Sequence, residues 1–239
     1  MAVSAVGLGR AHFGEGVEGG GRHDHAELAG EFVYEAAGLV GRVAGRVALL
    51  GEGAELGALF GDGFFPEDSV LASALANVNP QSHGPLAVFN WTRIERAENW
   101  PQYHCMTPGV SRAIEALDLE RRAVARAFGI ELGPIEEHFA RSFGTASTRL
   151  EDIAAELHAK RGGPPGPVRT DTRYVTEDMP YGLAFVEALG QIAGVPTPAT
   201  RTIVDAASLV NGIDFRQEND LLAPLGLARE TVAGLLARL

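Results

Sequence analysis

The sequence predicts a mostly α-helical protein whose first quarter is glycine-rich and holds no complete dinucleotide-binding fold. Capped helical patterns with apolar stripes recur from about residue 69 onward, whereas alternating strand patterns are scarce. Sixteen of the 30 glycines lie in residues 1–63, and all 13 prolines lie at Pro66 or later. We therefore divide the chain into a glycine-rich segment, 1–63, and a helical domain, 64–239, that forms a multi-helix bundle.

Proline and glycine mark the ends of the predicted helices. Thr107 and Pro108 begin the longest helix, which ends before Gly129. Residues 163–176 are predicted to be an extended loop, and residues 77–85 a rigid, polar, non-helical stretch. The other predicted helices cover about 26–50, 54–60, 69–76, 134–144, 148–162, 180–193, 197–212 and 228–238.

Composition limits the class of protein. The formal charge is 20 − 31 = −11, which argues against a general nucleic-acid binder, because that function needs a basic face. A single cysteine cannot form an internal disulfide. No apolar run approaches the roughly 20 residues that span a bilayer, and no signal-peptide pattern begins the chain. We expect a cytoplasmic protein with neither a membrane nor a nucleic-acid partner.

The first segment that holds candidate catalytic residues runs through residues 77–93. It contains Asn79, His83 and Trp91. Because imidazole titrates near neutral pH, His83 is a candidate general acid or base. A histidine held by hydrogen bonds within a loop is the more common arrangement, and these residues alone leave both interpretations open.

The second segment runs through residues 169–183 and combines arginines, carboxylates and tyrosines. Arg173 can hold a carboxylate with two parallel hydrogen bonds. Asp178 or Glu177 can orient a histidine and stabilise its charged form. Carboxylates at a helix N-terminus are also favoured by the helix dipole, so capping and internal salt bridges explain this segment equally well.

The histidines do not form a recognisable metal site. His23 and His25 flank Asp24, but no further ligand has suitable spacing, so a solvated loop is favoured. Cys105, next to His104, is interpreted as a buried or pocket-wall residue, because the chain has no second cysteine. We assign no metal ligand.

Taken together, the two segments resemble the opine dehydrogenase family, the octopine/nopaline dehydrogenase group. The resemblance covers about residue 60 to the C-terminus, with the motifs in the family's order. It implies a helical catalytic domain like the C-terminal domain of 6-phosphogluconate dehydrogenase. The motifs are Asn77-Val78-Asn79-Pro80 with His83, Asn90-Trp91, Arg173-Tyr174-x-Thr176-Glu177-Asp178-x-Pro180-Tyr181-Gly182, Gly194-Val195-Pro196-Thr197-Pro198, and Ala207-Ser208 with Asn211-Gly212.

The resemblance also implies an activity and the residues that perform it. Members of the family are oxidoreductases that use NAD or NADP to condense an amino acid with a 2-oxo acid and to reduce the imine. By this resemblance, His83 is the general acid/base, Asp178 pairs with it, and Arg173 holds the substrate carboxylate. Further candidates for the substrate pocket are Asn79, Trp91 and Tyr174.

The chain departs from the family in its first quarter. A dinucleotide-binding domain needs a strand, a G-x-G-x-x-G/A turn and a helix. Gly7-Leu8-Gly9 is followed by His12 where the third small residue belongs, and only 82 residues precede His83. We therefore assign no cofactor-binding residue in this chain. We expect residues 1–63 to be a remnant of the nucleotide-binding domain, or the product of a wrong start or a shifted reading frame.

Two functions remain. The first is the catalytic and substrate domain of an opine-type dehydrogenase, incomplete without a nucleotide-binding domain. The alternative is a non-catalytic helical module, derived from that family, that binds substrate or dimerises. The intact set of His83, Arg173 and Asp178 favours the first function. An apolar bundle face left exposed would promote association, so a homodimer is compatible with either.

Overall fold

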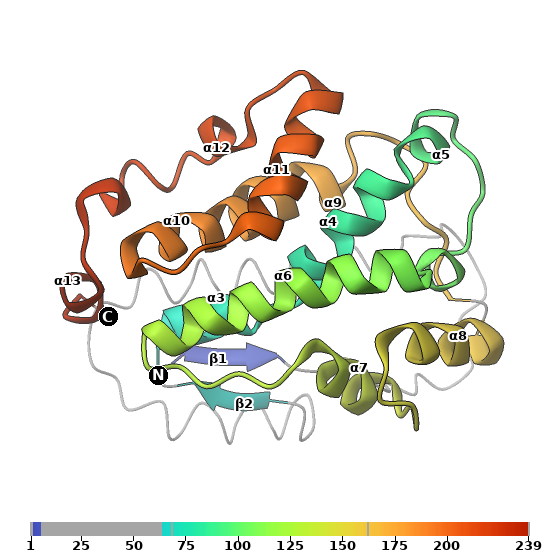
Figure 1. Cartoon of the computed structure of the whole chain (residues 1–239), viewed down its shortest axis with the longest axis horizontal. Helices are drawn as coiled ribbons and strands as arrows, with labels where there is room; N and C mark the ends of the chain where they lie inside the picture. The colour runs from blue at the N-terminus through green and yellow to red at the C-terminus, as the bar shows by residue number, and fades with distance from the viewer. Residues whose placement is uncertain (1, 6–63, 68, 162, 239) are drawn as a thin grey trace, which may run out of the picture. The chain divides into compact units, whose positions relative to one another are not determined.

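Figure 1 shows the computed structural model of the chain, which describes residues 2–5, 64–67, 69–161 and 163–238. The chain packs as two compact units, Met1–Ser73 and Ala74–Leu239. In the first unit, strands β1 (Ala2–Ala5) and β2 (Phe64–Glu67) pair antiparallel. The helices predicted at 26–50 and 54–60 lie outside the described residues, as do Gly7-Leu8-Gly9, His12, His23 and His25.

Helices make up the second unit, so the mostly α-helical fold predicted from the sequence is confirmed. None of the helices in the described part of the chain is both long enough and apolar enough to cross a membrane. In chain order the α-helices are α3 (Val70–Ala76, across the boundary between the units), α4 (Asn79–Phe89), α5 (Trp91–Glu95), α6 (Pro108–Ala127), α7 (Ile135–Phe143), α8 (Leu150–Arg161), α9 (Arg173–Thr176), α10 (Ala184–Ala193), α11 (Pro198–Asn211), α12 (Phe215–Glu218) and α13 (Val232–Leu236). Between them lie the 3-10 turns η1 (Tyr103–Cys105) and η3 (Leu227–Arg229) and the π-helix η2 (Asp178–Leu183).

Helix α6 is the long element against which α4, α10 and α11 pack (Figure 1). It begins at Pro108, whose missing N–H is not needed in the first turn, with Thr107 as the N-cap residue. It ends at Ala127, and Gly129 follows with a φ of 76°, which a glycine adopts without strain. The predicted start and end of this helix are therefore confirmed.

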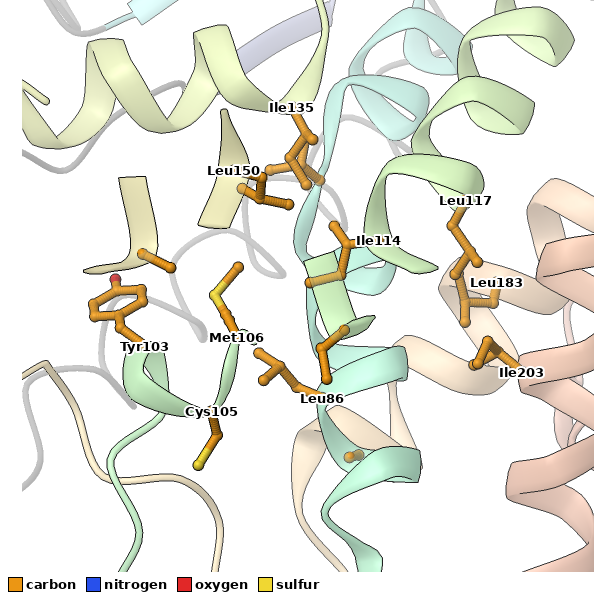
Figure 2. Close-up of a cluster of buried hydrophobic side chains, with 14 of the residues drawn as sticks. Leu86, Tyr103, Cys105, Met106, Ile114, Leu117, Ile135, Leu150, Leu183 and Ile203 are labelled. Carbon is orange, nitrogen blue, oxygen red and sulfur yellow. The ribbon is translucent and has the colours of Figure 1, made fainter. Parts of the chain in front are cut away.

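Apolar side chains from four elements form the core of this unit. Leu86 of α4, Ile114 and Leu117 of α6, Leu183 of η2 and Ile203 of α11 are at most 4% exposed. Figure 2 shows these side chains converging between the helices. Because burying one such side chain stabilises a protein by about 1.5–3 kcal/mol, this core holds α4 and η2 in place.

The prediction of a non-helical stretch over residues 77–85 is wrong. The structure has α4 there, and Pro80 lies in the first turn of this helix, where a proline is tolerated. Pro85 lies inside the same helix and costs it a hydrogen bond. Most of α4 is buried, however, and tertiary packing of this extent overrides a poor helix propensity.

Two further boundaries differ from prediction. The loop predicted over 163–176 ends in the short helix α9, which begins at Arg173 and buries Val175. The helix predicted over 180–193 is two elements, the π-helix η2 and then α10. A π-helix has no distinct residue period in such a short segment, so the sequence could not separate them.

Candidate functional site

Two glycines let α4 and η2 approach closely, and these elements carry the two residues of the candidate acid/base pair. A Cβ atom added at Gly182 of η2 would overlap the ring of Pro80 in α4. A Cβ added at Gly84 of α4 would lie 2.7 Å from Cδ1 of Leu183. The absence of a side chain at Gly182 therefore lets the two backbones approach, and Gly84 leaves room for the side chain of Leu183.

Across this contact His83 meets Asp178, although the two residues are 95 positions apart in the chain. Nδ1 of His83 lies 2.7 Å from Oδ2 of Asp178, a distance typical of a charge-assisted hydrogen bond. A carboxylate can only accept, so Nδ1 carries the proton and Nε2 is the acceptor of the neutral ring. Both side chains are only partly buried, at 17% and 15% exposed, so the pair is accessible to a substrate.

Tyr174 covers one face of the His83 ring. The two rings are stacked with centroids 3.6 Å apart and planes only 4° from parallel. The Tyr174 hydroxyl donates a hydrogen bond of 2.6 Å to Oε1 of Gln102. Burial, and then the nearby Asp178 carboxylate, raise the pKa of Tyr174 above its ordinary value of 10, so this phenol stays neutral.

Arg173 begins α9, directly before Tyr174. Its Nε donates a 2.9 Å hydrogen bond to Oε2 of Glu177, one turn along the chain. The side chains are 49% and 33% exposed, so the pair lies at the surface. A substrate carboxylate at Arg173 would therefore share this guanidinium with Glu177.

The remaining two candidates, Asn79 and Trp91, differ in their surroundings. Asn79 is exposed and lies one helical turn before His83, so it shares a face of α4 with the histidine. Trp91 begins α5 and is 9% exposed within the hydrophobic core. Its surroundings are those of a packing residue.

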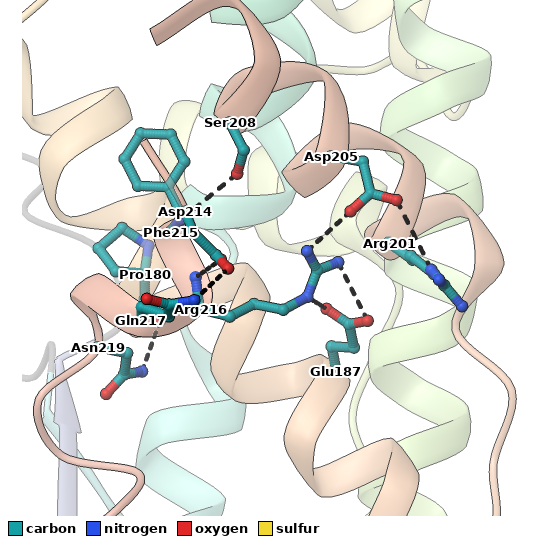
Figure 3. Close-up of polar contacts among 10 residues, drawn as sticks. All are labelled: Pro180, Glu187, Arg201, Asp205, Ser208, Asp214, Phe215, Arg216, Gln217 and Asn219. Atoms are coloured by element: carbon teal, nitrogen blue, oxygen red, sulfur yellow. Dashed lines mark hydrogen bonds and ion pairs between the residues drawn. The ribbon is translucent and has the colours of Figure 1, made fainter. Parts of the chain in front are cut away.

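The C-terminal part of the unit forms hydrogen bonds and ion pairs with η2, α10 and α11 (Figure 3). Asn219 donates a 2.6 Å hydrogen bond to the carbonyl oxygen of Pro180, within the π-helix. Arg216 binds the carboxylates of Glu187 on α10 and Asp205 on α11, both at 2.7 Å. These bonds tie the segment after α11 to the elements around η2, and so support the position of Asp178.

A separate cavity of about 370 Å³ lies beyond the end of α4. Cys105 is buried at this cavity, as a pocket-wall residue, and its Sγ accepts a hydrogen bond from Nη1 of Arg93. Burial raises the pKa of the Cys105 thiol more than Arg93 lowers it, so the sulfur is a thiol and not a reactive thiolate. The lining residues are Phe89, Asn90, Arg93, His104, Cys105, Thr107 and Val110.

Neither a metal nor a dinucleotide has an evident binding site in the described ranges. Within them, no three His, Cys, Asp or Glu side chains cluster in a way that could hold a metal ion. In the same ranges no glycine-rich turn joins a strand to a helix, because β2 leads into α3 through a segment without glycine. The described residues therefore show no phosphate-binding turn of the kind found in dinucleotide-binding domains.

Gln102 and Gly182 contribute to the candidate site, but the sequence alone predicts no role for either. Gln102 lies in an irregular stretch and does not titrate, so no motif or charge pattern marks it. Gly182 stands within the family motif, but only the structure reveals its contact with Pro80. Both contribute through contacts between distant parts of the chain.

Comparisons with known proteins agree on one family. Residues 66–211 match the family described as NAD/NADP octopine/nopaline dehydrogenase, alpha-helical domain. An opine dehydrogenase of Arthrobacter sp. (strain 1C) is 33% identical over 169 residues, which is 70% of this chain and 47% of that protein. A vitopine synthase of Allorhizobium ampelinum is 25% identical over 156 residues, which is 64% of this chain and 42% of that protein.

A solved structure shares the fold. Octopine dehydrogenase in complex with NADH and L-arginine superposes with a TM-score of 0.63 at 17% sequence identity, over 81% of this chain and 56% of that one. The chain spans about half the length of the curated relatives that it matches. The chain belongs to the octopine/nopaline dehydrogenase family, and residues 66–211 are its α-helical domain.

Proposed function

We propose that this chain provides the catalytic and substrate-binding half of an NAD(P)-dependent opine-type dehydrogenase. Such an enzyme condenses the amino group of an amino acid with the carbonyl carbon of a 2-oxo acid, releases water and reduces the imine to a secondary amine. The observation that carries the proposal is the 2.7 Å contact between His83 and Asp178. A cytoplasmic location, expected from the sequence, is part of the proposal.

His83 provides the proton chemistry in this proposal. When protonated, its Nε2–H donates to the oxygen of the 2-oxo acid and polarises the carbonyl for attack by the amine. After the attack, Nε2 takes a proton from the attacking nitrogen and returns it to the new hydroxyl, which leaves as water while the imine forms. Asp178 holds the ring by Nδ1 and stabilises the imidazolium that forms.

Arg173 supplies the anchor for the carboxylate of the 2-oxo acid. A guanidinium has the planar donor geometry that matches a carboxylate, and it is always charged. Arg173 directly precedes Tyr174, which is stacked on His83, and this proximity in the chain supports the proposed role. Asn79, which shares a face of α4 with His83, completes the proposed substrate contacts; Trp91 would support the pocket by packing.

The reduction needs a nicotinamide hydride donor, as the family description indicates. We assign no residue in the described part of this chain to the binding of that donor. A homodimer remains a prediction. In the alternative function, a non-catalytic module, the chain would bind substrate without any acid/base chemistry at His83.

The test joins this domain to the dinucleotide-binding domain of the Arthrobacter relative and measures NADH oxidation with pyruvate and a panel of amino acids. We expect His83→Ala to lower turnover about 100-fold or more, the usual contribution of a general acid/base. Arg173→Gln should mainly raise KM for the 2-oxo acid. Arg169→Gln is the matched control, because Arg169 is also an exposed arginine paired with a carboxylate, that of Asp171.

Calorimetry on the chain itself provides a second measurement that needs no cofactor. Pyruvate should bind to the unmodified chain and to Arg169→Gln, and more weakly to Arg173→Gln. Unchanged kinetics in His83→Ala would exclude the acid/base role. Binding of substrates by the chain, together with no turnover in the fusion, would instead favour the non-catalytic module.

A further inference from the structure

We propose that Gln102 and Tyr174 form a clamp that fixes the plane of the His83 ring, so that Gln102 is a positioning residue for the acid/base. The clamp consists of the Tyr174 ring stacked on His83 and the hydrogen bond from the Tyr174 hydroxyl to Gln102. This inference rests on the proposed function, because it concerns the residue to which that function assigns the proton chemistry.

The bond to Asp178 cannot orient the imidazole alone. It holds Nδ1, but the ring can still tilt about the line from Nδ1 to Oδ2. A stacked ring at 3.6 Å and 4° removes this freedom on one face. With both contacts in place, Nε2 has a single direction, and the atom that must meet the substrate oxygen is fixed before the substrate arrives.

Tyr174 needs an anchor of its own to act in this way. It lies on α9, which has only four residues and is too short to be stable by itself. The 2.6 Å bond from its hydroxyl to Oε1 of Gln102 provides the anchor, at the end of the side chain farthest from the backbone. The raised pKa of Tyr174 keeps the hydroxyl protonated, so it remains a donor at any physiological pH.

Gln102 is held firmly enough to act as the anchor of the Tyr174 hydroxyl. Its side chain is buried, at 7% exposed, and its backbone N–H donates to the carbonyl oxygen of Pro164. Next to it, Nε1 of Trp100 donates a 3.0 Å hydrogen bond to the carbonyl oxygen of Pro167. The segment that carries Gln102 is therefore bound at two points to residues 164–167, about 65 positions later in the chain.

The test is an NMR measurement on the chain as it stands, with isotope-labelled histidine. The His83 ring signals are identified by their loss in His83→Gln. In the unmodified chain, we expect these proton signals to be displaced upfield by the stacked tyrosine. Gln102→Leu and Tyr174→Phe both break the hydroxyl bond, the second without removing the ring, and each should reduce the displacement and broaden the signals.

The double variant strengthens the test. Since both single changes remove the same bond, Gln102→Leu with Tyr174→Phe should change the His83 signals no more than either change alone. Gln81→Leu is the matched control. Gln81 is also buried, but its Oε1 has no hydrogen-bond partner among the described residues, so the His83 signals should stay in place.

In the fusion with a dinucleotide-binding domain, the clamp variants should lower kcat by about tenfold to a hundredfold with little change in KM, the effect of a misaligned catalytic group. Unmoved His83 signals in cooperatively folded Tyr174→Phe, or additive effects in the double variant, would overturn the clamp. If Gln102→Leu fails to fold, Tyr174→Phe decides. Failure of His83→Ala to affect turnover would refute the proposed function and leave the NMR result standing.

Discussion

Glu177 pairs with the guanidinium of Arg173 that we propose as the anchor of the substrate carboxylate. Its carboxylate accepts a 2.9 Å hydrogen bond from Nε of Arg173 before any 2-oxo acid is present. Exposed ion pairs of this kind are worth about 0.2–1 kcal/mol. That energy is enough to weaken the binding of a second carboxylate to the same guanidinium by a measurable factor.

We therefore expect Glu177→Gln to tighten the binding of a 2-oxo acid. Removing one negative charge beside Arg173 should lower the Kd for pyruvate by up to about fivefold, the factor that corresponds to an exposed ion pair. Titration calorimetry at low salt measures it. Asp171→Asn is the matched control, because it releases Arg169 in the same way. Equal effects of the two variants would show that only the overall charge matters.

At the scale of residues, the sequence predicted the identity of the candidates but not their contacts. Nothing in the spacing of His83 and Asp178 implies that they meet, and only the family resemblance predicted it. The stacking of Tyr174 on His83 was not predicted, because a ring that faces a substrate and a ring that faces a histidine have the same sequence signature.

At the scale of elements, the site depends on the contact between α4 and η2. These elements bring His83 and Asp178 together because Gly182 lies directly against Pro80. A proline ring has no alternative rotamer into which it can move away. Any side chain at position 182 must therefore push the two backbones apart.

Gly182→Ala should disturb stability and site together. We expect a loss of about 1–3 kcal/mol in the free energy of unfolding, the usual cost of overpacking, and altered NMR signals of His83. Denaturant unfolding measures the first effect. In the control, Gly109→Ala, the new Cβ meets nothing closer than 3.8 Å, so that variant should be unchanged or slightly more stable. A fully stable Gly182→Ala with unaltered His83 signals would contradict this account.

Helix α7 carries a pH-sensitive group. Burial, then the positive charges of Arg141 and Arg121, lower the pKa of His138 below its ordinary value of 6.5, against the opposing effect of Asp118. The unfolded chain therefore takes up this proton at a higher pH than the folded chain does. The stability that depends on a neutral His138 is fully present above pH 6.5 and is lost as the pH falls toward the lowered pKa.

Urea unfolding at a series of pH values from about 7.5 to 5 tests this dependence. The free energy of unfolding should decrease below pH 6.5 in the unmodified chain, and His138→Gln should show a smaller decrease over the same interval. The difference between the two curves isolates His138 from other titrating groups. Parallel curves would refute the assignment.

The helices that the sequence predicted best are those whose ends are marked by local chemistry. Helices α6 and α11 begin at a proline, and α11 ends at Gly212, which has a φ of 70°. Helix α4 was missed because its proline and glycine are read locally as breakers. Its helical state comes from burial against other elements, which a local pattern does not contain.

At the scale of the whole helical unit, one buried ion pair connects three parts of the bundle. Arg121 and Asp118 of α6 are 1% and 2% exposed, and Nη2 of Arg121 lies 2.6 Å from Oδ1 of Asp118. Nη1 of Arg121 also donates to the carbonyl oxygen of Leu75 near the end of α3. Oδ2 of Asp118 accepts from the backbone N–H of Ile135, at the start of α7.

Removing one partner of this pair should cost more than removing both. Arg121→Met leaves the Asp118 carboxylate buried and uncompensated, so we expect a loss of about 3–5 kcal/mol. The double variant Asp118→Leu with Arg121→Met removes that charge and should be less destabilised than Arg121→Met alone, because an apolar pair has no desolvation cost. Arg126→Met, whose exposed partner Glu131 lies 3.8 Å away, should change stability by less than about 1 kcal/mol. Denaturant unfolding of the unmodified chain and the three variants measures these changes in the free energy of unfolding. If the double variant is the least stable of the set, the pair acts through its backbone hydrogen bonds to α3 and α7 instead of its charge.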